Sequence, residues 1–436
     1  MSYVGSGLLP IEHASKIGHM KLIQDPHIQR MLSEFESTET TTGEPIGFRT
    51  GHIDINIEND INFIITIDGG ESVVPNEIRS QKRLAFISVC ALLLRVRDIE
   101  EMRQCPVMDP RELPSKLQTW NNSAILPLSG IRYPNETLRD TIRKTIDSTL
   151  HYTGLYSTLK FLVSREWDPD YTMGSEDAPH FNCRNCREVI FVPKSAISFR
   201  CPNCRHPHTL SDYLGIGEEC PDEWAREESA TALRDVLETL TLFHYVQIWY
   251  RQPHKLGQVL FIKDGPLLLR AGLYRLSDSI RGLIQYLRDE GIPLHLVGIE
   301  KNGELVNHIE EIKEHLPEAG DFFAPSVRYI IENINGYAFE PEGRPYRNRV
   351  QYGSKVVARI GPHHIIPIDV PTGNFLLEPN IDDLYGFQET LSVLSRMTCY
   401  KYENALIPIV LANAYASISQ KPSGDILYSF ASRFFS

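Results

Sequence analysis

The chain has 436 residues, of which 42% are hydrophobic, and this content allows a buried core in two or three domains. Its formal net charge of −12 argues against a protein that holds nucleic acid unaided, since phosphate contacts usually require a basic excess. Residues 1–10 carry no basic and apolar leader, and the longest apolar run, residues 84–94, is shorter than the roughly 20 residues that span a bilayer, so we expect a soluble cytoplasmic protein.

Strands and helices are predicted to alternate along most of the chain. A polar, Thr-rich stretch at residues 36–44 is typical of a loop or linker. Residues 84–94 fit either a buried strand or a helix. Apolar runs predict strands at residues 61–67, 259–263, 295–299, 350–360 and 364–370, and helical periodicity predicts helices at 135–150 (capped by Asn135), 224–250, 276–290, 382–397 and 405–419. This alternation indicates an α/β or α+β fold with a mixed central sheet flanked by helices.

The composition divides the chain into four parts. We expect an N-terminal extension at residues 1–55 and the first part of a core domain at 56–177. A cysteine-paired, proline-punctuated insertion follows at 178–215, and the second part of the core at 216–436.

Four of the eight cysteines form two close pairs. Cys183 and Cys186, then Cys201 and Cys204, give two C-x2-C motifs joined by a short hairpin-like stretch. Four thiolates suit tetrahedral Zn2+, and each short turn directs two sulfurs at one metal. The sequence therefore predicts a zinc ribbon in this insertion. The adjacent His206 and His208 are predicted not to be ligands, because the ligand set is already complete.

The ribbon has two possible roles. It can be a metal staple for a segment too small to fold alone, or a surface that contacts nucleic acid. Between Cys183 and His208 the chain places five basic residues against one acidic residue: Arg184, Arg187, Lys194, Arg200 and Arg205 against Glu188. Because zinc with four thiolates carries about −2, the module is only mildly positive, which favours the staple.

Two carboxylates follow apolar strands and precede glycine. Asp68 closes residues 63–67 and begins Asp68-Gly69-Gly70, and Asp264 closes residues 259–263 and begins Asp264-Gly265-Pro266-Leu267. Each motif alone is most often a strand-to-turn transition. Taken as a pair on rigid strands, they predict a site for divalent metal, because two-metal phosphodiester hydrolysis needs carboxylates that converge on one point.

In their order along the chain these motifs resemble the NurA nuclease family. An early strand closed by Asp-Gly-Gly precedes an Arg-containing helix with a glutamate, and a strand closed by Asp-Gly-Pro-Leu precedes a Val-Gly-Ile-x-Lys strand end. A late helix with proline completes the pattern. The matching residues here are Asp68–Gly70, Arg234 to Glu238, Asp264–Leu267, Val297–Lys301 and Ile407–Ala416. The resemblance covers most of residues 60–420, apart from the ribbon.

The resemblance implies an RNase H-like fold and a Mn2+- or Mg2+-dependent DNA nuclease. It also implies a homodimer and partnership with a HerA-type hexameric DNA translocase, in DNA end processing or in defence against foreign DNA. Family roles carry over to Asp68, Glu238 and Asp264 as metal ligands, with Glu227 and Glu228 as substitutes for Glu238. Lys301 is expected to contact phosphate, although Lys-Asn-Gly is also an ordinary turn.

Two features depart from the family pattern. The family's C-terminal histidine is Asn413 here, and an amide can ligate a hard cation but cannot act as an acid or base near neutral pH. His363 and His364 are alternative sources of an imidazole. The zinc ribbon is the second departure. These departures leave two other functions open: a catalytically impaired, zinc-stapled adaptor of a translocase complex, and an RNA-directed nuclease of the same fold.

Overall fold

The computed structural model divides the chain into two units, Met1–Pro45 and Ile46–Ser436. It describes residues 25–34, 49–75, 82–104, 116–171, 178–193, 198–218, 224–340, 350–399, 406–418 and 424–435. The first unit contributes helix α2 (Pro26–Glu34). The predicted loop at residues 36–44 lies outside the described residues. Everything below concerns the second unit.

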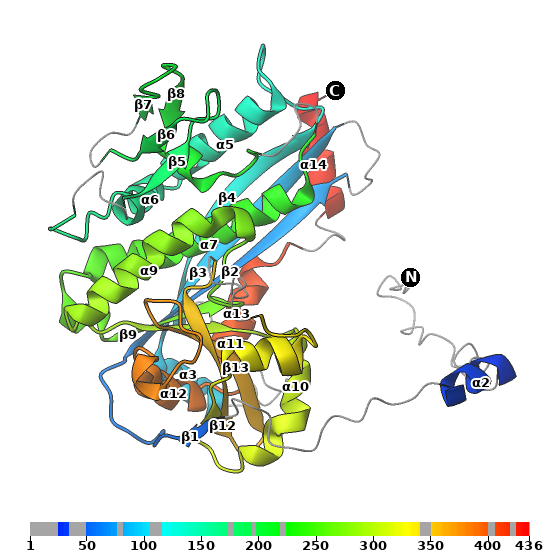
Figure 1. Ribbon diagram of the computed structural model, residues 1–436, viewed down its shortest axis with the longest axis vertical. Coiled ribbons are helices and arrows are strands. Elements are labelled where there is room, and N and C mark those ends of the chain that lie inside the picture. Colours follow the sequence, from blue (N-terminus) through cyan, green and yellow to red (C-terminus); the bar gives the residue numbers. More distant parts are fainter. Residues whose placement is uncertain are drawn as a thin grey trace. The chain divides into compact units, whose positions relative to one another are not determined.

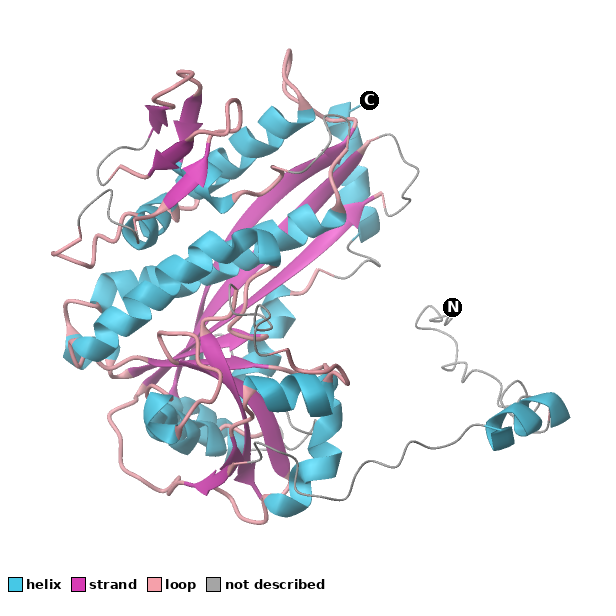
Figure 2. Cartoon of the chain, viewed as in Figure 1, coloured by secondary structure: helices cyan, strands magenta, loops and turns pink. Residues whose placement is uncertain are grey.

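A mixed sheet organises the second unit (Figures 1 and 2). In the described part of the chain it has nine strands in the order β1-β11-β12-β13-β10-β9-β2-β3-β4. Their bounds are β1 (Thr50–His52), β2 (Phe63–Val74), β3 (Arg83–Arg95), β4 (Leu117–Ser129), β9 (Val259–Asp264), β10 (His295–Ile299), β11 (Asp321–Phe323), β12 (Gly353–Gly361) and β13 (His364–Pro371). Strands β2, β9 and β10 are parallel to one another, and β3 is antiparallel to both β2 and β4. The predicted mixed central sheet is confirmed.

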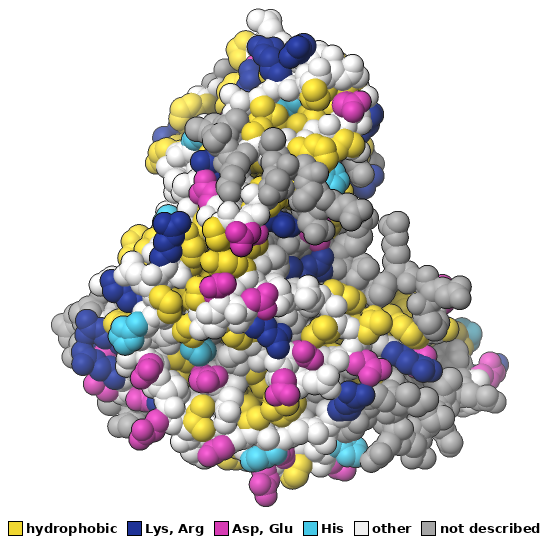
Figure 3. All heavy atoms as spheres, turned by 60° about the vertical axis from the view of Figure 1, so that its left-hand side comes forward, with side chains coloured by type: hydrophobic (Ala, Val, Ile, Leu, Met, Phe, Trp, Pro, Cys, Tyr) yellow, Lys and Arg dark blue, Asp and Glu magenta, His cyan; other side chains and the backbone are white. Residues whose placement is uncertain are grey.

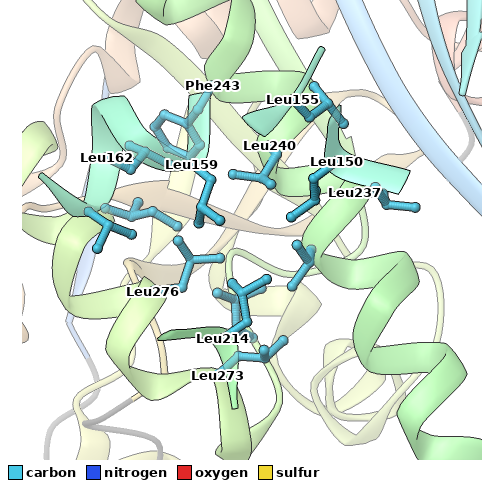
Figure 4. Packing of buried hydrophobic residues seen from close by; sticks show 14 of the residues in the cluster. Leu150, Leu155, Leu159, Leu162, Leu214, Leu237, Leu240, Phe243, Leu273 and Leu276 are labelled. Atoms are coloured by element: carbon cyan, nitrogen blue, oxygen red, sulfur yellow. The ribbon is translucent and has the colours of Figure 1, made fainter. Parts of the chain in front are cut away.

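Helices cover both faces of this sheet. On one face lie α5 (Leu138–Tyr152), α6 (Tyr156–Val163), α7 (Glu227–Trp249) and α9 (Tyr274–Asp289), and on the other α3 (Val96–Gln104), α12 (Phe387–Ser395) and α13 (Ile407–Ala416). Along β2, Ile65 and Ile67 pack toward α7, whereas Ile64 packs toward the α12 and α13 side, as strand alternation requires. Figure 4 shows the leucines of α5, α6, α7 and α9 converging on one another, which fixes α7 above the sheet.

The shorter elements complete the fold. They are α8 (Pro253–Leu256), α10 (Glu304–Ile312), α11 (Val327–Tyr329) and α14 (Asp425–Phe435), together with short 3-10 helices and a π-helical turn at Ile330–Ile334 that follows α11. Within the described residues, no helix is both long enough and apolar enough to cross a membrane.

The structure resolves one open alternative and differs from two local predictions. Residues 84–94, which fit either a strand or a helix, lie in strand β3. Helix α5 begins after Thr137, whose side chain accepts a hydrogen bond from the Asp140 amide, so Thr137 and not Asn135 is the cap. Strand β2 does not end at Asp68 but continues to Val74, because β3 pairs with it along its whole length.

Candidate functional site

Asp68 and Asp264 lie side by side on neighbouring strands. The parallel ladder between β2 and β9 extends to the pair Ile67 and Lys263, so the next residue on each strand is an aspartate. Asp264 is the last residue of β9, whereas Asp68 lies inside β2 at the point where its β9 partner ends. By strand alternation, both aspartates leave the sheet on the face that α13 covers.

The Asp68 carboxylate is buried and incompletely paired. The residue is 7% exposed, and its Oδ1 accepts a hydrogen bond from the Gly69 amide at 2.7 Å. Its Oδ2 is buried and accepts no hydrogen bond from the described residues. Burial, and next the negative charge of Asp264, raise the pKa of Asp68 from 3.8 to about 7, against the opposing effect of Lys301. A buried carboxylate oxygen without a donor, beside a second carboxylate, fits a site for a hard divalent cation.

Lys301 pairs with Asp264 and acts on Asp68 through its charge. It follows β10, and its Nζ donates a hydrogen bond to Oδ2 of Asp264 at 2.6 Å. The Lys301 side chain is 42% exposed and that of Asp264 is 14% exposed, so the ammonium group remains accessible from solvent. The structure thus brings together three of the residues that the sequence singled out.

Glu238 lies on the other side of β2. Its carboxylate is in ion pairs with Lys263 Nζ at 3.2 Å and Arg234 Nε at 3.3 Å, and the residue is 4% exposed. Burial raises the pKa of Glu238, and the two cations offset only part of that effect. Gly69 permits this close approach, because a Cβ at Gly69 would lie 2.4 Å from Glu238 Oε1.

The three predicted carboxylates therefore do not form a compact triad here. Among the described residues, four cysteines form the group whose possible metal-ligand atoms all lie within 4.8 Å of one another, and no carboxylate belongs to that group. Glu227, in the first turn of α7, forms an ion pair with Arg83, and neither Glu227 nor Glu228 lines the cleft described below.

Asn413 is an exposed residue of α13, the helix that covers the Asp68 face of β2. The next turn of α13 approaches the strand closely, since a Cβ at Gly70 would lie 2.6 Å from the Ala416 carbonyl oxygen. Asn413 does not line the cleft. His363 and His364, at the turn between β12 and β13, do not line it either.

A cleft of about 690 Å³ lies beside the candidate carboxylates and Lys301. Asp68, Glu238, Asp264 and Lys301 all contribute to its wall. A larger hollow, of about 1300 Å³, lies between residues 55–63 and α12 and has none of these carboxylates in its wall. The smaller cleft is therefore the candidate site.

Sequence reasoning missed a buried network beside Asp264. Lys355 of β12 is 5% exposed and donates to Glu300 and, at 3.1 Å, to Oδ1 of Asp369. The other Asp369 oxygen accepts from the Leu267 amide at 2.9 Å, which holds the loop that follows Asp264. Lys355 thus ties that loop to Glu300, the neighbour of Lys301. The sequence signal that could have found Lys355 is a charged residue inside a predicted apolar strand. The same signal marks Lys263.

The second site is the four-cysteine cluster. The ligand-capable sulfurs of Cys183, Cys186, Cys201 and Cys204 all lie within 4.8 Å of one another. Two hairpins carry them, β5 (His180–Asn182) with β6 (Val189–Phe191), and β7 (Ser198–Arg200) with β8 (Pro207–Thr209). The predicted cluster is confirmed, and its geometry fits a zinc ribbon.

The two C-x2-C turns have the same backbone form. The Arg187 amide donates to the Cys183 carbonyl at 2.8 Å, and the Arg205 amide donates to the Cys201 carbonyl at 3.0 Å. Arg187 and Arg205 both have left-handed backbone, with φ of 65° and 62°. Such repeated turns direct each pair of sulfurs toward a common centre.

The inner side of the ribbon belongs to the main core. Cys183, Cys201 and Phe181 are buried in the same cluster as the leucines of α7. His208 lies with Nε2 3.4 Å from Cys183 Sγ and with Nδ1 3.1 Å from Asp212, so it supports the cluster from outside the four sulfurs. Asp212 also accepts from Arg143 of α5 at 2.5 Å. These contacts favour a structural role, as a metal staple, for the inner side of the ribbon.

Comparison with known proteins adds a weak structural likeness. No family model and no curated protein matches the chain. Among solved structures, the chain is similar to the crystal structure of the NurA nuclease from Sulfolobus solfataricus, with 11% sequence identity and a TM-score of 0.37 over 97% of this chain and 98% of that chain.

Proposed function

We propose that this chain is a divalent-metal-dependent DNA nuclease of the cytoplasm that hydrolyses phosphodiester bonds. The observation that carries the proposal is the Asp68 and Asp264 pair. Two adjacent carboxylates, one with a buried oxygen that accepts no hydrogen bond from the described residues, open into a cleft that also holds lysines and arginines. Acidic groups suit the metal and basic groups suit the phosphates of the substrate. The motif order described above supports the same activity.

We assign each candidate residue of the site a role in hydrolysis. Asp68 and Asp264 would hold the Mn2+ or Mg2+, which supplies an activated water and charge stabilisation when bound. Lys301, already beside Asp264 and accessible from solvent, binds and orients a phosphate oxygen of the substrate. Glu238 is the proposed third ligand once it leaves Lys263. Asn413 lies on the α13 side of β2 outside the cleft wall, and α13 would have to move for its amide oxygen to reach the metal.

The partners follow from the charge as well as from the resemblance. The chain is acidic overall, with a formal net charge of −12, and on the face in Figure 3 the acidic and basic side chains are interspersed. Such a surface attracts free DNA weakly. We therefore propose a homodimer that receives DNA from a HerA-type hexameric translocase, with structural Zn2+ in the ribbon. DNA end processing and defence against foreign DNA both fit this role.

The test is cleavage of linear duplex and single-stranded DNA with Mn2+ or Mg2+, with and without the translocase. Wild-type protein should shorten the DNA, and Asp68→Asn and Asp264→Asn should each lower the rate by at least 100-fold. Asp382→Asn, an exposed aspartate remote from the cleft, is the matched control. Equal rates for wild type and both cleft variants would sink the proposal, and an RNA substrate in the same panel tests the RNA-directed alternative.

A second candidate is a catalytically impaired, zinc-stapled adaptor of the translocase complex. The observation that favours it is that Glu238 is held in ion pairs with Lys263 and Arg234, away from the aspartates. Calorimetric titration of zinc-loaded protein with Mn2+ separates the two functions. A nuclease binds Mn2+ in the wild type and loses binding in Asp264→Asn, whereas an adaptor binds none in either.

A further inference from the structure

Among the described residues, five cations line the cleft, and two of them are open to solvent. The side chains of Lys263 and Lys355 are 6% and 5% exposed, and that of Arg234 is 26% exposed. Neighbouring carboxylates hold all three. The side chains of Arg270 and Lys301, by contrast, are 44% and 42% exposed. Arg270 and Lys301 are therefore the cations that a ligand in the cleft reaches most readily.

The backbone that carries Arg270 is tied to its surroundings along its length. It follows Asp264, the last residue of β9, and runs through the cleft wall to Arg270. Three alternate amides of this segment donate hydrogen bonds to neighbouring segments at 2.8, 2.9 and 3.0 Å: Gly265 to the Ile299 carbonyl, Leu267 to the Asp369 carboxylate and Leu269 to the Val350 carbonyl. Arg270 therefore has a fixed position relative to Asp264.

One carboxylate orients the Arg270 side chain. Asp235 of α7 has its Oδ2 3.2 Å from Arg270 Nε and its Oδ1 3.2 Å from Arg234 Nη2. Within the described part of the chain, no other carboxylate lies at ion-pair distance from Arg270, and its guanidinium group donates no hydrogen bond there. Because Asp235 is shared between two arginines, it holds Arg270 in place but neutralises only part of its charge. The N–H groups of Arg270 remain available to a second anion.

We propose that Arg270 is a second phosphate-binding residue of the cleft, which holds a backbone phosphate that flanks the cleaved one. The inference rests on the proposed nuclease function. A planar guanidinium group matches two phosphate oxygens and makes charge-assisted hydrogen bonds to them. Lys301 follows β10 and Arg270 follows β9, and these strands are parallel, with Ile299 paired to Asp264. Both segments thus leave the sheet at the same edge, where one strand of the substrate can contact both cations.

The first test is fluorescence anisotropy of labelled duplex and single-stranded oligonucleotides with zinc-loaded protein and no added Mn2+ or Mg2+, so that no DNA is cleaved. Arg270→Gln should bind about tenfold more weakly at low salt, because it loses a charge-assisted hydrogen bond. Its plot of log K against log salt should lose about 0.9 in slope with duplex, or about 0.7 with a single strand, as expected for one phosphate contact. Arg270→Lys keeps the charge and should keep the slope.

The second test is steady-state cleavage with Mn2+. A flanking phosphate is bound equally in the ground state and in the transition state, so Arg270→Gln should raise KM by about tenfold and leave kcat within about twofold. The urea midpoint should stay at the wild-type value. If the ion pair with Asp235 served only to hold the loop, Arg270→Gln would instead lower the urea midpoint and leave the salt slope unchanged.

The matched control is Arg49→Gln. Arg49 is also an exposed arginine in an ion pair, with Glu378 at 2.9 Å, and it does not line the cleft. It changes the net charge by the same amount and should bind like the wild type. Equal binding by wild type and Arg270→Gln, an equal loss in the control, or no binding by the wild type at low salt would each overturn the inference.

These outcomes are distinct from failure of the proposed function. If Arg270→Gln weakens binding and lowers the salt slope but wild-type protein cleaves nothing with Mn2+, the phosphate site at Arg270 stands and the nuclease proposal falls. If Asp264→Asn abolishes cleavage while Arg270→Gln binds and cleaves like the wild type, the nuclease stands and the inference about Arg270 falls.

Discussion

Replacing Asp68 by asparagine should make the protein more stable when no divalent metal is added to the cleft. Burial and the neighbouring Asp264 raise the pKa of Asp68 from 3.8 to about 7. Between these two values the native protein binds a proton that the unfolded chain has released, so stability falls as pH rises through this window. A rise of about 3 in pKa corresponds to about 4 kcal/mol once the pH exceeds 7. Asparagine carries no charge, and its side-chain oxygen can still accept from the Gly69 amide.

The assay is urea unfolding of zinc-loaded wild type and Asp68→Asn at pH 4, 6 and 8. The variant should gain about 2–4 kcal/mol at pH 8 and almost nothing at pH 4. Mn2+ at 100 times its Kd should stabilise the wild type by about 2.7 kcal/mol and should stabilise the variant less, because the variant lacks a ligand oxygen, so the difference between the two proteins should shrink. Asp382→Asn, an exposed aspartate, should change neither measurement.

Two results would refute this reasoning. If Asp68→Asn is less stable than the wild type at pH 8, the charge of Asp68 must be stabilised by its surroundings in the folded protein. Equal stabilisation of both proteins by Mn2+ would mean that Asp68 is not a ligand.

Three further perturbations test other parts of the structure. Lys355→Met leaves Glu300 and Asp369 buried without their cation and should cost about 3–5 kcal/mol in urea unfolding; a loss below 1 kcal/mol would show that the network is solvated. Gly69→Ala places a Cβ against Glu238 and should destabilise the protein by about 1–3 kcal/mol, whereas Gly272→Ala, with open space around it, should be near neutral in the same assay. Cys183→Ser should abolish stoichiometric zinc in a metal-release assay and lower the melting temperature of the whole unit, and retained zinc would contradict the four-sulfur site.

The central strands could be predicted because they are buried on both sides. β9 and β10 carry apolar runs at residues 259–262 and 296–299, and such runs have few alternatives once glycine and proline bound them. Strand β4 was missed because it is an edge strand with exposed polar residues such as Asn121 and Ser123, which interrupt the apolar pattern. The true cap of α5 was missed because asparagine and threonine are both good caps, and only the backbone distinguishes Thr137 from Asn135.

The sequence could name candidate residues for the site but not their arrangement. Asp68 and Asp264 are adjacent because their strands are parallel neighbours, which the shared motif already indicated. The face on which Glu238 lies depends on which helix covers which side of β2, and no local pattern contains that information. The sequence also could not show that Lys263 pairs with Glu238 or that Lys355 pairs with Asp369, because each pair joins residues on different elements of the fold.

At Gly69 and Gly70 the strand β2 presents bare backbone to both of its covering helices. Glu238 of α7 occupies the space on one side of Gly69, and the Ala416 carbonyl of α13 occupies the space on the other side, at Gly70. The Gly69–Gly70 backbone therefore meets both covering helices with no side chain between them. If Asp68 and Asp264 hold a cation as proposed, a shift of Asp68 would move the same stretch of β2 against which Glu238 packs.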